Sequence, residues 1–221
     1  MSAAVLGVGL VATGCSAVKV GSAAIVGNQR ITVATLDTEV TNLSENVKQY
    51  HNPGSLTVVQ QTQDPLTWLI RFQINEQLAR QAGITVSPGA AQAAWAAIYA
   101  EAKANAASQG VANASQNLIL VNAGIPPNLY TDVQRYAAID NLYEAMVNGG
   151  KAPTTQSASN AAGAKLARAQ CLAAKSLKIQ VNPQFGRLNY TSYEVVPAAS
   201  TVTRAQGPAK AASLAGLAPA C

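Results

Sequence analysis

Aromatic residues, charged residues and cysteines are all scarce in this chain. Of its 221 residues, 5% are aromatic and 11% are charged, and it has three cysteines and a single histidine, His51. A lone histidine without a second ligand at useful spacing argues against a zinc site. No Walker or dinucleotide-binding motif is present, and no Ser lies in a nucleophile elbow. The sequence therefore predicts a protein that is not an enzyme and needs no metal or cofactor.

The composition also bounds the fold class and the partners. The net charge is +5, but the fifteen basic residues are scattered and form no run. Because a nucleic-acid-binding face needs a basic patch, we expect no nucleic-acid partner. Apolar residues make up 49% of the chain and many of them are alanine, which favours helix over sheet. A mainly α-helical protein of one or two domains is expected.

The first fifteen residues, "MSAAVLGVGLVATGC", contain an apolar stretch too short to span a bilayer. The stretch fits a secretory signal peptide over 1–14, although no Lys or Arg precedes it, which leaves open whether Met1 is the true start. Ala12-Thr13-Gly14-Cys15 resembles the bacterial lipobox, with Ala at a position where Leu is usual. Cys15 is therefore a candidate lipidation site followed by a tether over 15–21. The alternative is a free or buried cysteine after a plain signal peptide.

Two cysteines remain if Cys15 is acylated. In a secreted chain, Cys171 and Cys221 invite a disulfide bond. The helical periodicity places Cys171 on the charged side of its helix, near Arg168 and Lys175, where a C-terminal tail can reach it. The alternative is an unpaired thiol at the C-terminus.

The pattern of apolar residues and turn residues predicts a short hairpin and about six helices. The hairpin covers 23–33 and turns at Gly27-Asn28. The helices are expected over 36–50, from Asp64-Pro65 to Gly83, from Ser87-Pro88 to about 110, over 115–123, within 125–150 and over 160–177. Trp68 and Phe72 add a second apolar stripe to the second helix, which predicts that it is buried on two sides.

Two segments lack any apolar periodicity. The first lies in "NGGKAPTTQSASNAAG", residues 148–163, and predicts a linker over 148–160. Residues 197–221 contain mostly Ala, Pro, Ser and Thr and read as a low-complexity tail.

Four stretches resemble SurA/PrsA-type extracytoplasmic foldases. "AAIVGNQRITVATLDTEV" is similar to their mature start, in which a strand and turn lead to a helix near a Leu-Asp pair, here Leu36-Asp37. "LARQAGITVSPGAAQAAWAAI" is similar to the place where a helix ends in Gly and Ser caps the next one. "LVNAGIPPNLYTDVQRYAAIDNLYEAM" and "KIQVNPQFG" are similar to the last helix before the family's insertion and to its closing strand. Together they cover about residues 20–188.

The resemblance implies one SurA N-terminal-like chaperone domain over 22–196, built from an N-terminal helical region and one returning C-terminal helix. In the family a parvulin-type prolyl isomerase domain is inserted between the two, and the linker 148–160 stands at that position without any parvulin sequence. The implied protein is a lipid-anchored chaperone on the extracytoplasmic face of a bacterial membrane. It would bind unfolded or exported polypeptides as a holdase, without isomerase activity. We also expect the strand at 22–26 to pair with a strand at 178–182.

Four aromatic residues are candidates for a polypeptide-binding groove: Trp95, Tyr99, Tyr136 and Tyr143. Large aromatic side chains can hold apolar segments without sequence preference. The alternative for each is ordinary core packing. A second function stays open as well, that of a structural or partner-binding cell-envelope lipoprotein with no client binding.

Overall fold

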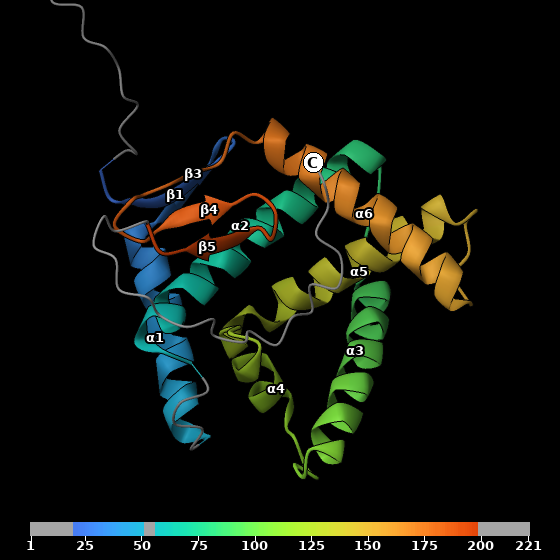
Figure 1. The fold of residues 1–221 in the computed structure, drawn as a ribbon, viewed down its shortest axis with the longest axis horizontal. Coiled ribbons are helices and arrows are strands. Elements are labelled where there is room, and N and C mark those ends of the chain that lie inside the picture. Colours follow the sequence, from blue (N-terminus) through green and yellow to red (C-terminus); the bar gives the residue numbers. More distant parts are fainter. Residues whose placement is uncertain (1–19, 51–55, 199–221) are drawn as a thin grey trace, which may run out of the picture.

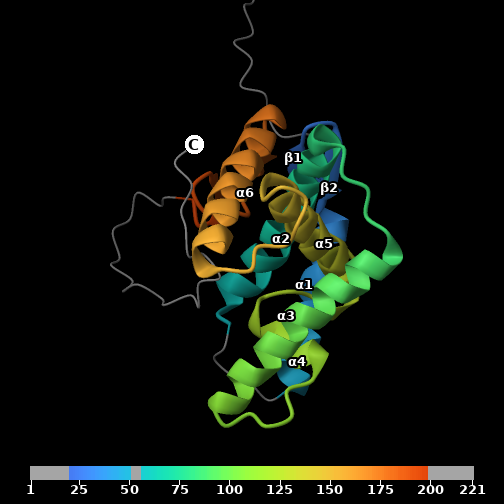
Figure 2. The same cartoon turned by 90° about the vertical axis from the view of Figure 1, so that its right-hand side faces the viewer.

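A computed structural model describes residues 20–50 and 56–198, which form six α-helices, five short strands and one 3-10 turn (Figures 1 and 2). The helices are α1 Val33–Gln49, α2 Val58–Ala82, α3 Pro88–Ser108, α4 Gln116–Asn122, α5 Tyr130–Val147 and α6 Gln156–Ser176. The strands are β1 Ser22–Val26, β2 Gln29–Thr32, β3 Gln180–Val181, β4 Arg187–Asn189 and β5 Glu194–Val196, and the turn is η1 Pro127–Leu129. The predicted mainly helical class is confirmed. The signal segment with Cys15, the residue His51, and the tail with Cys221 lie outside the described residues.

Local capping sets the first helix and the third. Thr32 accepts a hydrogen bond from the Thr35 backbone N–H at 2.9 Å and caps α1, which begins at Val33, before the predicted start at 36. Ser87 caps α3 in the same way, with Pro88 in the first turn. Gly83 ends α2 in the left-handed conformation that helix ends favour, with φ +67°. The expected end of α2 and start of α3 are therefore confirmed, because each depends only on neighbouring residues.

The predicted start of the second helix at Asp64-Pro65 is wrong. α2 begins at Val58, where Thr57 and Gln60 form a reciprocal capping box. The first turns of α2 have no apolar face in the sequence because they bury little: Val58 and Val59 are 81% and 53% exposed. Pro65 lies inside the helix, where it lacks one N–H donor. The capping box therefore fixes the start, and the proline sits within a helix held by buried neighbours.

α2 is the central element and separates two apolar cores. Side chains from one face of α2 pack against β1 in the first core cluster. Side chains of α6 and the C-terminal strands pack into the same cluster. The other face carries Trp68 and Phe72 into a second, aromatic cluster with residues of α3, α4 and α5. The expectation that this helix is buried on two sides is confirmed.

The two ends of the described chain meet in a small antiparallel sheet of order β2-β1-β3. Ala24 lies opposite Val181, and the Asn182 side-chain amide donates to the carbonyl of Ser22 at 3.0 Å. The Gly27 N–H donates to the Leu177 carbonyl at 2.7 Å, at the end of α6. The predicted pairing of the N-terminal strand with a strand near 178–182 is therefore confirmed.

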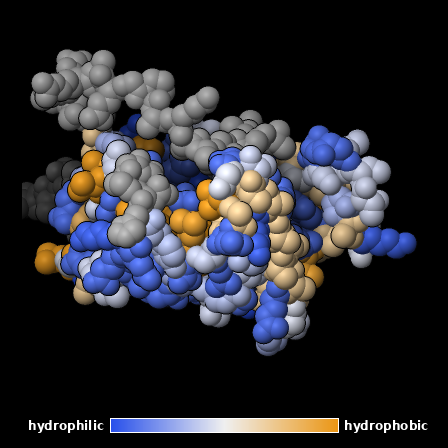
Figure 3. Space-filling view, turned by 90° about the horizontal axis from the view of Figure 1, so that it is seen from below, coloured by the Kyte–Doolittle hydropathy of each residue, from blue (hydrophilic) through white to orange (hydrophobic). Residues whose placement is uncertain are grey.

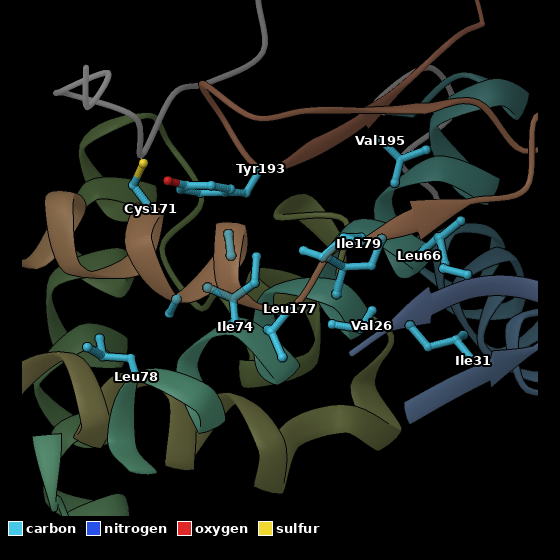
Figure 4. Packing of buried hydrophobic residues seen from close by; sticks show 14 of the residues in the cluster. Val26, Ile31, Leu66, Ile74, Leu78, Cys171, Leu177, Ile179, Tyr193 and Val195 are labelled. Carbon is cyan, nitrogen blue, oxygen red and sulfur yellow. The ribbon is translucent and has the colours of Figure 1, made fainter. Parts of the chain in front are cut away.

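A second hairpin, β4–β5, covers α2 and part of α6. The Val195 N–H donates to the Thr67 hydroxyl of α2 at 2.8 Å, in a buried position. Tyr193 and Cys171 lie side by side in the first core cluster (Figure 4). Cys171 is only 1% exposed in the packed structure, within the core cluster that Tyr193 joins. Cys171 is disulfide-bonded, and a bridge to Cys221 stays a prediction.

α6 returns to pack on both α2 and α5 (Figure 2). It begins earlier than predicted, at Gln156, because the Thr155 hydroxyl accepts from the Ala158 N–H at 3.2 Å and caps the helix. The predicted linker over 148–160 is therefore too long. Its second half is helical but largely exposed, which explains the missing apolar periodicity.

Gly124 stands at a position that demands glycine. Its φ is +70°, and a Cβ there would lie 2.5 Å from the Oδ2 atom of Asp64. Gly110 has a φ of +88° but open space around it. We expect Gly124→Ala to lower the free energy of unfolding by about 3 kcal/mol, as the sum of backbone strain and overpacking. Gly110→Ala should cost about 1 kcal/mol.

Urea unfolding of both variants, followed by circular dichroism, measures these losses. Because both variants carry the backbone strain, their difference reports the contact with Asp64. Equal losses would show that the packing of Asp64 against Gly124 contributes nothing.

Candidate functional site

The aromatic cluster between α2 and α5 is tightly packed. The ring of Tyr136 meets those of Trp68 and Phe72 edge-on, with centroids 5.7 and 6.0 Å away. The Trp68 indole N–H donates to the Ala123 carbonyl at 3.1 Å, just after α4. Edge-to-face pairs of this kind add stability beyond their buried area. Tyr136 is therefore a packing residue of this cluster.

α3 is fastened to the molecule mainly near its N-terminal half. Trp95 is 5% exposed, stacks on Tyr99 at 6.1 Å and meets Tyr130 edge-on at 5.6 Å. The Trp95 indole donates to Gln116, and the Tyr99 hydroxyl donates to the Ala114 carbonyl. These contacts hold α3 against the loop before α4 and the start of α5.

The four aromatic candidates do not gather in one groove. Trp95, Tyr99 and Tyr136 belong to the aromatic cluster, while Tyr143 packs against the first core on another part of α5. All four have packing contacts that account for their burial. Their role in binding polypeptides stays a prediction, and exposed residues are the better candidates for first contact.

The exposed surface of α3 is apolar. Of its 21 residues, only Ala94 and Trp95 are buried, and its only charged residues are Glu101 and Lys103. Exposed alanines recur every three or four residues and form one face, which we call the α3 face: Ala93, Ala96, Ala97, Ala100, Ala104 and Ala107. Ile98 is 42% exposed but lies on the other side of the helix, toward Ala94 and Trp95. In Figure 3 moderately hydrophobic side chains run in a continuous column over α3.

α3 and α4 form an arm that extends away from the rest of the fold. The sheet and α6 lie at one end of the molecule, and the tips of α3 and α4 lie at the opposite end in both views (Figures 1 and 2). The loop between them carries Val111, which is 43% exposed. The arm thus presents apolar side chains where no other part of the described chain covers them.

A small cavity lies between α2 and α5, beside an ion pair. Glu76 and Arg135 pair across the two helices, and Asp132 lines the same cavity of about 60 Å³. Burial and the nearby Glu76 raise the pKa of Asp132. Ligand pockets usually measure about 300–1,000 Å³, so this cavity is too small for an organic substrate. The ion pair serves to join the helices.

A buried polar network joins α2, α5 and α6. The Oδ1 atom of Asp140 accepts from the side-chain amides of Asn75 at 2.8 Å and Gln170 at 3.0 Å. Gln170 also donates to the Oδ1 atom of Asn75 at 2.9 Å. Burial raises the pKa of Asp140 to about 7, although the hydrogen bonds from the two amides oppose the shift. We call these three residues the Asn75–Asp140–Gln170 network.

Sequence reasoning missed both the network and the α3 face. The network had a weak signal, since each of its residues is a polar residue on a helix whose neighbours are apolar. The α3 face had a clearer one, because alanines recur at helical spacing over Pro88–Ser108 on the side away from Trp95. Within the described residues, no group of acidic, histidine or cysteine side chains could hold a metal ion, and no helix is long and apolar enough to cross a membrane.

The raised pKa of Asp140 predicts a pH-dependent stability. The folded protein holds a proton that the unfolded chain releases above about pH 4, so the free energy of unfolding falls as pH rises from about 4 to 7. Asp140→Asn keeps the acceptor oxygen and cannot ionise. At about pH 8 we expect it to raise the free energy of unfolding by on the order of 2 kcal/mol, with little change at about pH 4.

Urea unfolding across this pH range tests the expectation. In Asp140→Asn the free energy of unfolding should depend less on pH but still fall, because burial and Glu194 also raise the pKa of Asp64 to about 7. Asp37→Asn, at an exposed position of α1, is the control. An unchanged slope in Asp140→Asn would show that this carboxyl does not titrate in that window.

Comparison with known proteins identifies no relative. No protein-family model, no curated protein and no solved structure matches this chain. Its function is therefore argued from its own residues and their arrangement.

Proposed function

We propose that this chain is an extracytoplasmic, membrane-anchored lipoprotein that holds unfolded or exported polypeptides without prolyl isomerase activity. The observation that carries the proposal is the α3 face, an apolar helix surface that the described part of the chain leaves uncovered. A broad apolar stripe on a helix normally packs against the core of its own protein. Its exposure favours a partner that supplies the missing apolar contact.

The chemistry of the α3 face suits a non-specific partner. Alanine side chains are small, so a flat apolar strip forms without pockets that select one side chain over another. An unfolded segment offers apolar groups in irregular order, and such a strip can contact many of them weakly. Exposed apolar surface on a soluble domain usually marks an interaction site.

The domain architecture supports the same proposal. The resemblance to SurA/PrsA-type foldases requires that the helix after the linker return to the N-terminal helices. α6 packs on α2 and α5, and β3 pairs with β1, so this requirement is met. The linker is short and joins α5 to α6 directly at the position where the family carries its isomerase domain.

The α3 face can be tested by suppression of aggregation. A chemically denatured test protein is diluted into buffer with the purified chain, and light scattering is recorded. We expect suppression by the natural sequence, and Ala97→Glu with Ala104→Glu should raise the concentration needed by about tenfold, because a carboxylate must lose its water to enter an apolar contact.

The matched control places the same charges on other helices. Ala34→Glu with Ala161→Glu adds two carboxylates at exposed positions of α1 and α6 and should leave suppression unchanged. If the natural sequence fails to suppress scattering at several-fold excess, the holdase proposal is wrong and a structural or partner-binding role is favoured. Equal effects of the two double variants would remove the α3 face as the binding surface.

The lipid anchor has its own test. Mass spectrometry of the chain from the membrane fraction of a bacterial host should find a diacylglyceryl-modified Cys15 as the first residue. Cys15→Ser should release the chain from that fraction. An unmodified Cys15 within a longer mature chain would contradict the proposed anchor. It would not bear on the proposal that the α3 face binds polypeptides.

A further inference from the structure

Six of the fifteen basic residues lie in one stretch of the chain that has no acidic residue. No aspartate or glutamate occurs between Glu144 and Glu194. The same stretch contains the basic residues Lys151, Lys165, Arg168, Lys175, Lys178 and Arg187. The stretch includes α6, β3 and β4, and its charged residues are all basic.

Three of these cations share one exposed face of α6. Lys165, Arg168 and Lys175 are spaced three and seven residues apart, which places them on the same side of the helix. Leu172 lies among them and is 58% exposed. We call these four residues the α6 basic face.

No acidic side chain neutralises the α6 basic face. In the described residues the ion pairs are Arg71–Glu194 and Arg135–Glu76, and neither involves α6. Glu144 of α5 approaches α6 at Gly163, which lies on the side of the helix opposite to Leu172. The Lys165 ammonium donates to the Val147 carbonyl at the end of α5 at 3.2 Å, and no carboxylate of the described residues pairs with the cations around Leu172.

We propose that the α6 basic face binds the anionic head groups of a phospholipid membrane and orients the domain on it. Cations that surround an exposed aliphatic side chain suit the boundary between head groups and acyl chains, where charge and apolar contact act together. A nucleic acid or an acidic protein would use the charges alone and leave Leu172 without a role.

The position of the face in the fold fits this partner. The proposal rests on the proposed lipid anchor in one respect, because Cys15 is five residues from Val20 and can reach at most about 18 Å from it. β1, which follows Val20, and α6 lie at the same end of the molecule, opposite the tips of α3 and α4 (Figures 1 and 2). A membrane held against α6 would leave the α3 face turned outward, toward arriving polypeptides.

Vesicle binding by the unacylated chain tests the surface independently of the anchor. Cys15→Ser protein is sedimented with vesicles of phosphatidylcholine alone or mixed with phosphatidylglycerol. We expect binding only to the mixed vesicles, and loss of binding at high salt. Removing two cations with Lys165→Gln and Lys175→Gln should weaken binding by about thirtyfold, at roughly fivefold for each basic residue near the surface.

The matched control removes two exposed lysines elsewhere, with Lys48→Gln on α1 and Lys103→Gln on α3, and should leave binding nearly unchanged. Leu172→Gln should weaken vesicle binding several-fold without altering the circular dichroism of the fold. Equal losses in the two double variants, or equal binding to both vesicle types, would overturn the proposal.

A competition separates the membrane from other polyanions. If duplex DNA or polyglutamate displaces the protein from vesicles at matched charge concentration, and Leu172→Gln has no effect, the face is a general anion-binding surface and the proposal is wrong. Aggregation suppression by the same Cys15→Ser protein reports on the holdase function, so failure of one proposal is distinguishable from failure of the other.

Discussion

The docking of α6 onto α2 and α5 is the contact on which the rest of the fold depends. Asp140 accepts from Asn75 and Gln170 at once, which requires three helices in one relative position. A buried acceptor that loses its donors costs free energy, so the network penalises any shift of α6 along its neighbours. Only with α6 in this place does the chain after it deliver β3 to β1 and the β4–β5 hairpin to α2.

The two cores on either side of α2 support different properties. The first core encloses the paired ends of the chain and uses aliphatic residues from distant segments. The aromatic cluster is smaller and holds α3 through Trp95 and its neighbours, while the rest of that helix stays exposed. A closed core and an arm with one uncovered apolar face therefore coexist in one domain. That combination suits a protein that must stay folded while it contacts unfolded chains.

The two ends of the molecule differ in their proposed roles. The proposed anchor and the α6 basic face belong to one end, and the α3 face belongs to the other. The N-terminal strand and α6 lie at the end expected to face a membrane, and the arm extends from the other end (Figure 1). The near-neutral pKa values of Asp64 and Asp140 add a dependence on pH to the packing of α2 with its neighbours. Neither carboxyl belongs to α3, so pH acts on the helices that carry the arm.

The sequence by itself determined that the chain is mainly helical and where several helices begin or end, whereas the pairing of the chain's ends was expected with the family resemblance. Thr32, Ser87 and Gly83 cap or end helices by bonding to their own backbone neighbours, so these boundaries can be predicted from the local sequence. Other features required the tertiary structure, because they depend on what distant segments cover. The β4–β5 hairpin packs beside Cys171, the α4 region turns Trp95 into a core residue, and Asn75, Asp140 and Gln170 meet from three helices. Burial and surface charge are properties of the assembled packing, and no single stretch of the chain encodes them.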